Sequence, residues 1–398
     1  MRKFIKIIAV SLSVLVGLMV LATLSIRVLY PPAKLRRLVE EQIRRDLHRE
    51  AQLGGVQVGI GGLTLSRFKL SEVPSFSAGT FLAVDEMDVR WAWLPLLSKQ
   101  VLINAIILDK PQINLIRRAD GKTLNISDLS TVTAPPSVKA AGVPVAAAAR
   151  TGAWSWRVDE IHLRHGAIQF SDRSPAKQTS ALSDIELILR GFNPARVQGR
   201  LTIGQLQNPV YTARDFSAEW SLHEIDPTLG HLNGWIRLKQ GRGLIQNLSN
   251  LVNSSRGAKL ALLPLVMLQN IDRLGFIRLG LPDFSRLSIT RIDGDYGFKE
   301  GTMRINTFEI VSPQLSIGAL GAIELASGGL AVDVTLNTPQ PTLLGEMNLK
   351  MHISGTLSHP KTNVGSLKKK AFKATVKQLL NKPDFQKNIN DTLKNIFH

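Results

Sequence analysis

The stretch LSIGALGAIELASGGLAVDVTL, residues 315–336, alternates apolar residues with small or polar ones. Apolar or small residues occupy every second position from Leu315 to Leu325, and the alternation resumes from Leu330 to Leu336. A period of two is typical of β-strands with one apolar face, because successive side chains of a strand point to opposite faces of a sheet. The stretch therefore predicts an antiparallel sheet that is wet on one side.

The same alternation extends over most of the chain from about Val56, which predicts a mostly β protein. A shorter pattern repeats within it: two apolar residues one apart, four residues of connection, then a second such pair. It occurs at Ile106/Leu108 with Ile113/Leu115, at Ile161/Leu163 with Ile168/Phe170, and at Phe308/Ile310 with Leu315/Ile317. The connections DKPQ, RHGA and VSPQ contain Pro or Gly, so each copy is interpreted as a hairpin of a repetitive sheet. The alternative is that short apolar pairs recur by chance in any β protein.

The N-terminal region differs from this sheet. Ile7 to Ile26 is a run of 20 residues without a charge, long enough as a helix to span about 30 Å of hydrocarbon. Arg2, Lys3 and Lys6 precede it, which predicts a cytoplasmic tail over 1–6, a transmembrane signal anchor over 7–26 and export of the rest. A cleaved signal peptide is the alternative.

Four further segments precede, interrupt or end the strands. Residues 33–50 have an apolar helical stripe beside arginines, formed by Leu35, Leu38/Val39, Ile43 and Leu47. This helix packs on the next domain, lies on a membrane, or does both. The segment 130–152 is a low-complexity loop that separates a first β segment, 55–129, from a second, 153–360. A helical insertion is expected at about 242–273, and basic helices are expected over 361–398.

The net charge of +18 does not indicate nucleic-acid binding, because it is concentrated at the ends of the chain. Residues 1–50 hold 10 Lys or Arg against 4 Asp or Glu, and residues 361–398 hold 9 against 2. Basic ends beside a hydrophobic anchor are suited to a membrane surface with anionic head groups. The expected surface contacts are Lys368, Lys369, Lys370, Lys373 and Lys377.

Signs of catalysis, metal binding or a cofactor are missing from the sequence, and none is expected. The chain contains no Cys, which excludes thiolate chemistry and disulfides. Gly121-Lys122-Thr123 lacks the earlier Gly of a phosphate loop and is interpreted as a turn. His162 and His165 are three apart in a strand, which predicts opposite faces. The acidic pairs Asp85/Asp88 and Asp293/Asp295 are weak candidates for acid–base chemistry.

Several of these features occur in an order that resembles the AsmA family of bacterial envelope proteins. The most specific are Trp93-Leu94-Pro95-Leu96-Leu97, the strand from Pro111 to Arg117, and the turn Asp120-Gly121-Lys122 followed by Asn125. The resemblance covers about 30–190 well and 285–358 loosely. It implies a single-pass inner-membrane protein with its bulk in the periplasm, and a U-shaped, twisted antiparallel β-groove with a few capping helices.

The function implied by the resemblance is transfer of phospholipids along an apolar groove. The expected partners are membrane phospholipids, the inner membrane and an envelope protein at the C-terminal end. An apolar sheet face needs a cover, and acyl chains supply one, whereas in a closed β-sandwich two sheets cover each other. The alternative function is a scaffold for assembly of outer-membrane proteins or lipopolysaccharide. The groove lining is expected to comprise the in-phase apolar residues Leu201, Ile203, Phe216, Trp220, Leu222, Ile236, Leu238, Ile317, Ile323, Val332, Val334, Met351 and Ile353.

Overall fold

A computed structural model of the chain describes residues 31–59, 61–92, 95, 100–127, 155–174, 179–193, 196–226, 228–246, 286–342, 345–356 and 360–363. The expected anchor 7–26, the loop 130–152 and the five C-terminal lysines lie outside the described residues. Among the described residues, no helix is long and apolar enough to cross a membrane.

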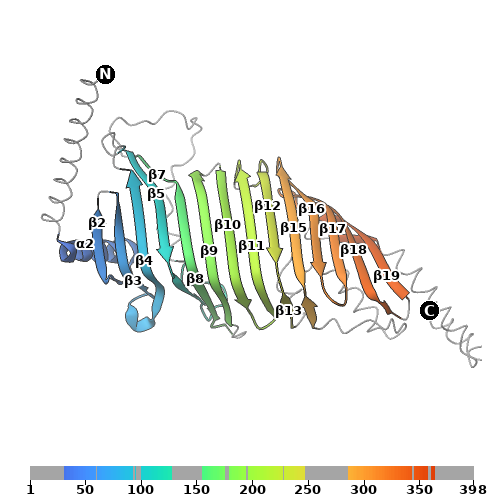
Figure 1. The fold of residues 1–398 in the computed structure, drawn as a ribbon, viewed down its shortest axis with the longest axis horizontal. Helices are drawn as coiled ribbons and strands as arrows, with labels where there is room; N and C mark the ends of the chain where they lie inside the picture. The colour runs from blue at the N-terminus through green and yellow to red at the C-terminus, as the bar shows by residue number, and fades with distance from the viewer. Residues whose placement is uncertain are drawn as a thin grey trace, which may run out of the picture. The chain divides into compact units, whose positions relative to one another are not determined.

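The described residues form one α-helix, one 3₁₀ turn and a large mixed sheet of 20 strands (Figure 1). The chain divides into two compact units: unit 1 comprises 1–209 and 217–221, and unit 2 comprises 210–216 and 222–398. The elements are α2 (Pro32–Leu47), β1 (Ala51–Gln52), β2 (Gly55–Gly59), β3 (Gly62–Ser71), η1 (Phe76–Ala78), β4 (Thr80–Ala92), β5 (Gln100–Asp109), β6 (Gln112–Arg117), β7 (Ser155–Val158), β8 (Glu160–Asp172), β9 (Thr179–Asn193), β10 (Arg196–Gln207), β11 (Tyr211–His223), β12 (Asn233–Gln240), β13 (Gly243–Ile245), β14 (Leu287–Ile289), β15 (Arg291–Lys299), β16 (Thr302–Val311), β17 (Ser316–Glu324), β18 (Gly329–Thr342), β19 (Gly345–Thr356) and β20 (Pro360–Asn363).

The helix α2 begins at a proline and ends in a left-handed residue. Pro32 occupies the first helical turn, where its missing N–H costs nothing. His48, with φ 54°, terminates the helix, and Arg44 and Arg45 lie in its last turn, where the helix dipole favours cations. The expected helix over 33–50 therefore exists but is shorter by three residues at its C-terminal end.

Two of the three expected hairpins are wrong, because the chain continues in the same direction through their connections. β5 and β6 both run parallel to β8, with Ile106 opposite Ile161 and Ile113 opposite Ile168. The second copy is a single strand, β8, with register shifts around Gly166. Only the third copy is a hairpin: β16 and β17 are antiparallel, with Ile310 opposite Ile317. The sheet is consequently mixed and not purely antiparallel.

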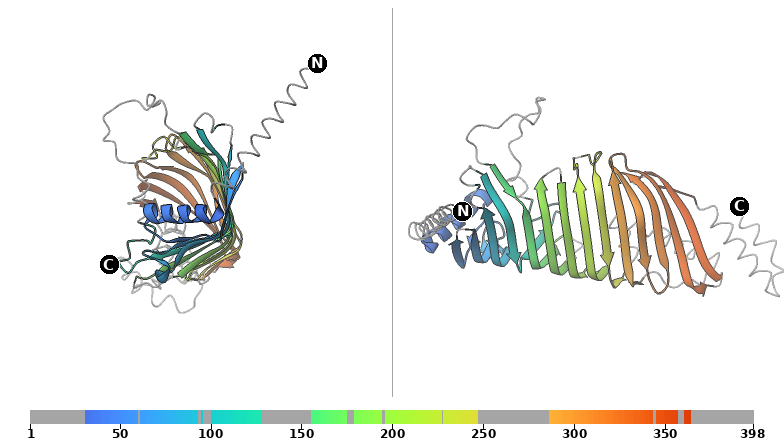
Figure 2. Two further views of the ribbon diagram at one scale, coloured as in Figure 1. Left: turned by 90° about the vertical axis from the view of Figure 1, so that its left-hand side faces the viewer. Right: turned by 45° about the horizontal axis from the view of Figure 1, so that its top comes forward.

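Bulges explain why these connections do not reverse the chain. Lys110 (φ 48°), His165 (φ 51°) and Asp184 (φ 53°) have left-handed backbone conformations within or between strands. A bulge adds one residue and bends its strand. The extra residue returns Leu108 and Ile113, which are an odd number of residues apart, to the same face. In unit 1, Figure 2 shows the strands bent around a concave side, on which α2 lies.

Two expected helices begin with residues that form strands. Gly243–Ile245 is β13, which pairs with β11 and β14, so the helical insertion does not include these residues. Lys361–Asn363 belongs to β20, which pairs with β19, so the basic helices cannot begin at 361. In both places backbone pairing along a neighbouring strand determines the local structure, which helical periodicity cannot reveal. Apart from Arg242 and Gln246, the remainder of both segments lies outside the described residues.

Candidate functional site

The inner face of unit 1 is a continuous apolar surface set by strand register. Across β8, β9 and β10, Leu163 lies opposite Leu187, and Leu187 lies opposite Leu201. The neighbouring rows follow the same rule, with Ile161 opposite Leu189 and Ile203 opposite Ile185. Paired residues point to the same face, so these strands present one apolar face.

A tryptophan fits against a glycine on this face. A Cβ built on Gly199 would lie 2.4 Å from Cζ2 of Trp220 and 2.9 Å from Cδ2 of Leu189. The indole of β11 therefore covers the backbone of β10 where a larger residue has no room. Glycine at position 199 is required by this packing and not by its backbone conformation.

This packing predicts the effect of a single methyl group. Replacing Gly199 with alanine is expected to displace Trp220 and to destabilise unit 1 by about 1–3 kcal/mol, the usual cost of overpacking. Denaturation followed by Trp fluorescence measures both effects. The control is Gly55→Ala in β2, where the nearest side-chain atoms are 3.9 Å from the built Cβ. If both substitutions cost the same, the Trp220 contact is not the cause.

The helix α2 seals the first strands of this face. Leu35, Val39, Ile43 and Leu47 pack against the buried cluster of Leu53, Val56, Leu65, Phe68, Leu70, Phe81 and Val84. Leu38, which the sequence placed in the apolar stripe, is instead 48% exposed. The predicted packing of this helix is thus confirmed, and contact of its arginines with a membrane surface stays a prediction.

A buried arginine joins the end of α2 to the sheet. Arg49 is fully buried, and its guanidinium donates to the carbonyl oxygens of Ser71 (3.1 Å) and Asn125 and lies 4.7 Å from the ring centre of Phe81. Asn125 is buried as well, accepts from the N–H of Ile116 and donates to Glu72. Sequence reasoning missed this cluster, because nothing in the sequence distinguishes Arg49 from its exposed neighbours Arg44 and Arg45.

Farther along the strands the inner face of unit 1 is less covered. Ile161, Leu163, Leu187, Leu189, Leu201 and Trp220 are only half-buried, whereas Ile185 and Ile203 are buried. Over β8 to β10 no described helix covers this face in the way α2 covers β2 to β4.

In unit 2 the remaining expected lining residues also share one face. Ile236 is opposite Tyr296, and from there the register leads through Ile305 and Gly321 to Val332 and Ile353. Ile317, Val332, Val334 and Ile353 are buried, while Ile236, Leu238 and Ile323 are half-buried. Phe216 and Leu222 alternate with Trp220 along β11 and are half-buried, and Met351 lies in β19 opposite Val334.

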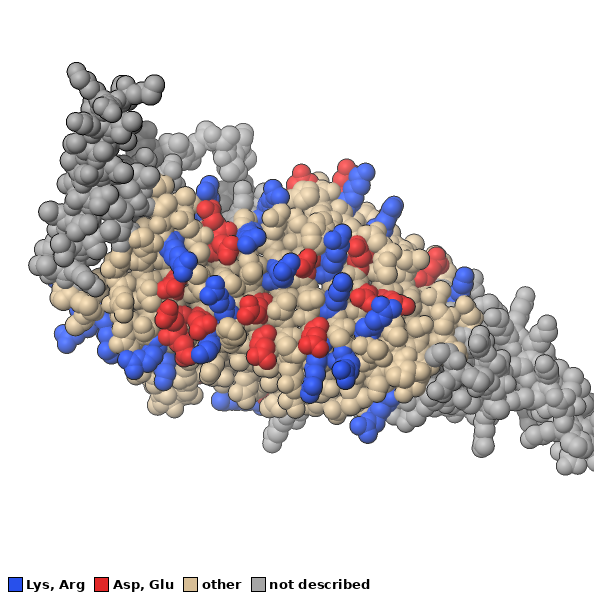
Figure 3. All heavy atoms as spheres, in the orientation of Figure 1, with Lys and Arg blue, Asp and Glu red and all other residues tan. Residues whose placement is uncertain are grey.

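The outer face of each unit is charged, as the mixture of Lys or Arg with Asp or Glu in Figure 3 shows. Ion pairs cross neighbouring strands, for instance Arg200 with Glu219 (2.7 Å) and Arg237 with Asp295 (3.1 Å). The acidic pairs considered for catalysis belong to this surface: Asp85 lies near Lys110, and Asp293 pairs with Arg291. These carboxylates take part in surface ion pairs. Asp88 also accepts a hydrogen bond from the hydroxyl of Thr64 at 2.6 Å and lines a pocket together with residues of β2, β3 and β4.

The expectation for the two histidines is wrong. His162 and His165 lie on the same face, and their Nε2 atoms are each 3.8 Å from an oxygen of Glu186. The bulge at His165 cancels the alternation that would have put them on opposite faces. Among the described residues, no group of three or more His, Asp or Glu is arranged to hold a metal ion.

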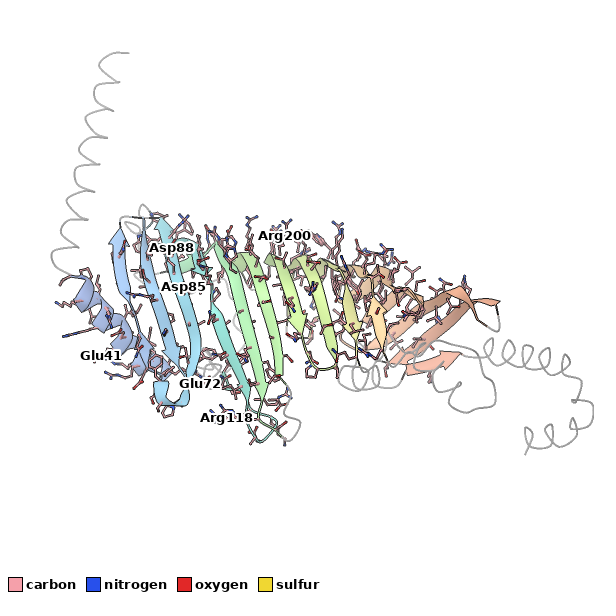
Figure 4. All side chains as sticks on the ribbon, turned by 60° about the horizontal axis from the view of Figure 1, so that its bottom comes forward. Glu41, Glu72, Asp85, Asp88, Arg118 and Arg200 are labelled. Carbon is pink, nitrogen blue, oxygen red and sulfur yellow. The ribbon has the colours of Figure 1, made fainter. Side chains whose placement is uncertain are left out.

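Polar residues border the apolar face at the C-terminal ends of β6 and β8. Arg117, two residues after Leu115, pairs with Asp172 (3.1 Å) and lies 5.2 Å from the ring centre of Phe170. The turn that follows β6 carries Arg118, which Figure 4 shows at the end of the strands. Asp120 closes that turn by accepting from the N–H groups of Lys122 and Thr123, both at 2.9 Å, which confirms the expected turn.

The fold and the site together define a class: a large mixed sheet, polar on one face and apolar on the other, with an amphipathic helix on its apolar side. A comparison with protein families specifies this class further. The model of the AsmA family matches residues 1–223, more than half of the chain, and the chain belongs to this family. No curated protein matches the chain.

Proposed function

We propose that this protein is an envelope protein anchored in the inner membrane that binds phospholipid by its acyl chains and transfers it between membranes. The observation that carries the proposal is the half-buried apolar face of β8, β9 and β10 in unit 1. Membership of the AsmA family and the large sheet support an envelope role of the bridge-like lipid-transport type.

The physical argument begins with the cost of moving a lipid through water. Two acyl chains contain about 30 methylenes, and keeping them out of water stabilises the complex by about 24 kcal/mol at about 0.8 kcal/mol per CH₂. A transfer protein therefore needs an apolar surface that is accessible to the chains. Half-buried leucines and isoleucines supply such a surface, and the charged outer face does not.

The degree of burial supports unit 1 as the primary site. An acyl chain can cover side chains that are half exposed, such as Leu187 and Leu201. It cannot reach side chains that are already buried, such as Ile317 and Val334 in unit 2, unless their cover moves. The expected lining residues are accordingly divided, and the half-buried Leu201 and Trp220 of unit 1 are the stronger candidates.

The proposal has no catalytic step. The acidic pairs considered for catalysis, Asp85/Asp88 and Asp293/Asp295, take part in surface ion pairs, and no cofactor is part of the proposed mechanism. The N-terminal run 7–26 is the proposed anchor, and the segment with Lys368, Lys369, Lys370, Lys373 and Lys377 is proposed to contact an anionic surface.

Photo-crosslinking tests lipid binding directly. A crosslinking residue at Leu187, Leu201 or Trp220 is expected to label lipid in cells, because these side chains face the proposed acyl chains. The same residue at Glu219, Arg237 or Asp333 is the control, since these side chains lie on the outer face and form ion pairs across strands. Equal labelling of both sets would contradict a groove.

Native mass spectrometry of the purified protein separates the two candidate functions. If it finds no bound lipid, the scaffold alternative is favoured.

A further inference from the structure

We propose that the C-terminal ends of β6 and β8 bind the phosphate of an anionic phospholipid whose acyl chains lie on the apolar face of unit 1. The proposed site is called the basic lip and consists of Arg117, Arg118, Lys122 and Arg173. This inference rests on the proposed lipid binding and adds to it a class of head group.

The position of Arg117 connects the lip to the apolar face. It follows Leu115 by two residues, so both point to the inner side, and Leu115 lies opposite Phe170. The guanidinium lies over the Phe170 ring and is 42% exposed, whereas the carboxylate side chain of Asp172 is only 4% exposed. Five N–H donors on Arg117 exceed what one buried carboxylate can accept, so donors remain for a second anion.

The carboxylates of the lip are already occupied by local bonds. The N–H of Ser174 donates to Asp172 at 2.8 Å, and hydrogen bonds from Ser174, with Arg117 nearby, hold the pKa of Asp172 below its usual value. The hydroxyl and N–H of Thr123 and the N–H of Lys122 lower the pKa of Asp120 to about 2. Both groups therefore stay ionised. Asp120 directs its oxygens into its own turn, and Asp172 divides its oxygens between Ser174 and Arg117.

Arg117 pairs with Asp172, whereas the other three cations of the lip lie at positions that backbone N–H hydrogen bonds fix. Arg118 and Thr123 are joined by a backbone hydrogen bond of 2.9 Å, and the N–H of Arg173 donates to the carbonyl of Arg117 at 3.0 Å. Gly121 lies close to Ser174, with 3.7 Å from its built Cβ, so the turn contacts the end of β8. Arg118, Lys122 and Arg173 are exposed, and the charge of Arg118 helps to lower the pKa of Asp120. Within the described residues, none of the three forms an ion pair.

This arrangement is suited to a phosphate that is attached to an apolar body. Arginine binds phosphate oxygens in a two-pronged geometry, and lysine adds a point charge. A free phosphate would use only the cations, whereas a phospholipid uses the cations together with Phe170 and Leu115. The adjacency of both surfaces therefore favours the lipid as the occupant.

The test compares two lipids with matched chains, phosphatidylglycerol and phosphatidylcholine, bound to the full chain in detergent micelles. Native mass spectrometry is expected to find a preference of the unsubstituted protein for phosphatidylglycerol. The triple substitution Arg118→Gln, Lys122→Gln, Arg173→Gln is expected to reduce phosphatidylglycerol binding at least about tenfold. The reason is that each cation near an anionic head group raises the affinity by a factor on the order of tenfold or less. Binding of phosphatidylcholine should remain, which also shows that the variant is folded.

A matched control removes the same charge elsewhere. The control is the triple substitution Lys69→Gln, Lys239→Gln, Lys350→Gln, which lowers the net charge by the same amount. These lysines are exposed on the outer face, so their replacement should leave the preference for phosphatidylglycerol intact. An equal loss in both triple variants would overturn the lip as a specific site. Displacement of phosphatidylglycerol by inorganic phosphate at comparable concentration would assign the site to free phosphate. Equal binding of both lipids by the unsubstituted protein would overturn the head-group inference alone, and binding of neither would overturn the proposed function with it.

Discussion

Replacing Arg49 with alanine is expected to destabilise unit 1 by about 3 kcal/mol or more. The guanidinium is fully buried and donates to the carbonyl oxygens of Ser71 and Asn125. Hydrogen bonds to a charged group stabilise by about 1.5–3 kcal/mol each, and removing the donor leaves buried acceptors unpaired. The loss should also release the C-terminal end of α2, which limited proteolysis after the helix would detect.

Two controls separate the position of Arg49 from its charge. Arg49→Lys retains the charge but cannot bond both carbonyls in the same geometry, so an intermediate loss is expected. Arg45→Ala, at the exposed end of α2 where Arg45 faces Glu41 at 3.7 Å, should cost less than about 1 kcal/mol. Equal stability of Arg49→Ala and Arg45→Ala in urea denaturation would contradict the role assigned to Arg49.

Much of the sheet can be predicted from the sequence, because strand alternation has a short and exact period. Leu201, Ile203 and Trp220 share an inner face, and Glu219 and Arg237 lie on outer faces, as the alternation indicates. The amphipathic pattern of α2 also identifies the residues that pack, with Leu38 as the exception. Neither inference needs knowledge of which strands are neighbours.

The errors arise where one residue changes the phase of a strand. Leu108 and Ile113 are five apart, and the same spacing separates Leu163 and Ile168. A tight reversal and a bulge both fit that spacing, and only the pairing with a third strand distinguishes them. The bulges also explain the histidines, since His162 and His165 are adjacent only because His165 is the extra residue.

Clusters of polar residues that are distant in the sequence could not be predicted from the sequence, for a different reason. Arg49, Glu72 and Asn125 are far apart along the chain, and each residue type is ordinarily exposed. The burial of one depends on the presence of the others, which no local pattern reports. The basic lip is similar in this respect, because the turn at Asp120 was predicted but its contact with the end of β8 was not.

Two substitutions in β17 test the assignment of faces by their contrast. Ile317→Ala is expected to destabilise unit 2 by about 2–5 kcal/mol, because Ile317 is fully buried opposite Leu336 and Ile310 and the truncation leaves a cavity. Leu320→Ala, three residues along the same strand, should change stability by less than about 0.5 kcal/mol, because Leu320 is 56% exposed on the outer face opposite Asp333. Urea denaturation of the full chain measures both.

Added phospholipid is not expected to restore the stability of Ile317→Ala preferentially, since this side chain is already buried without lipid. A selective rescue would show that acyl chains reach the face of unit 2, and the primary site would then extend beyond unit 1.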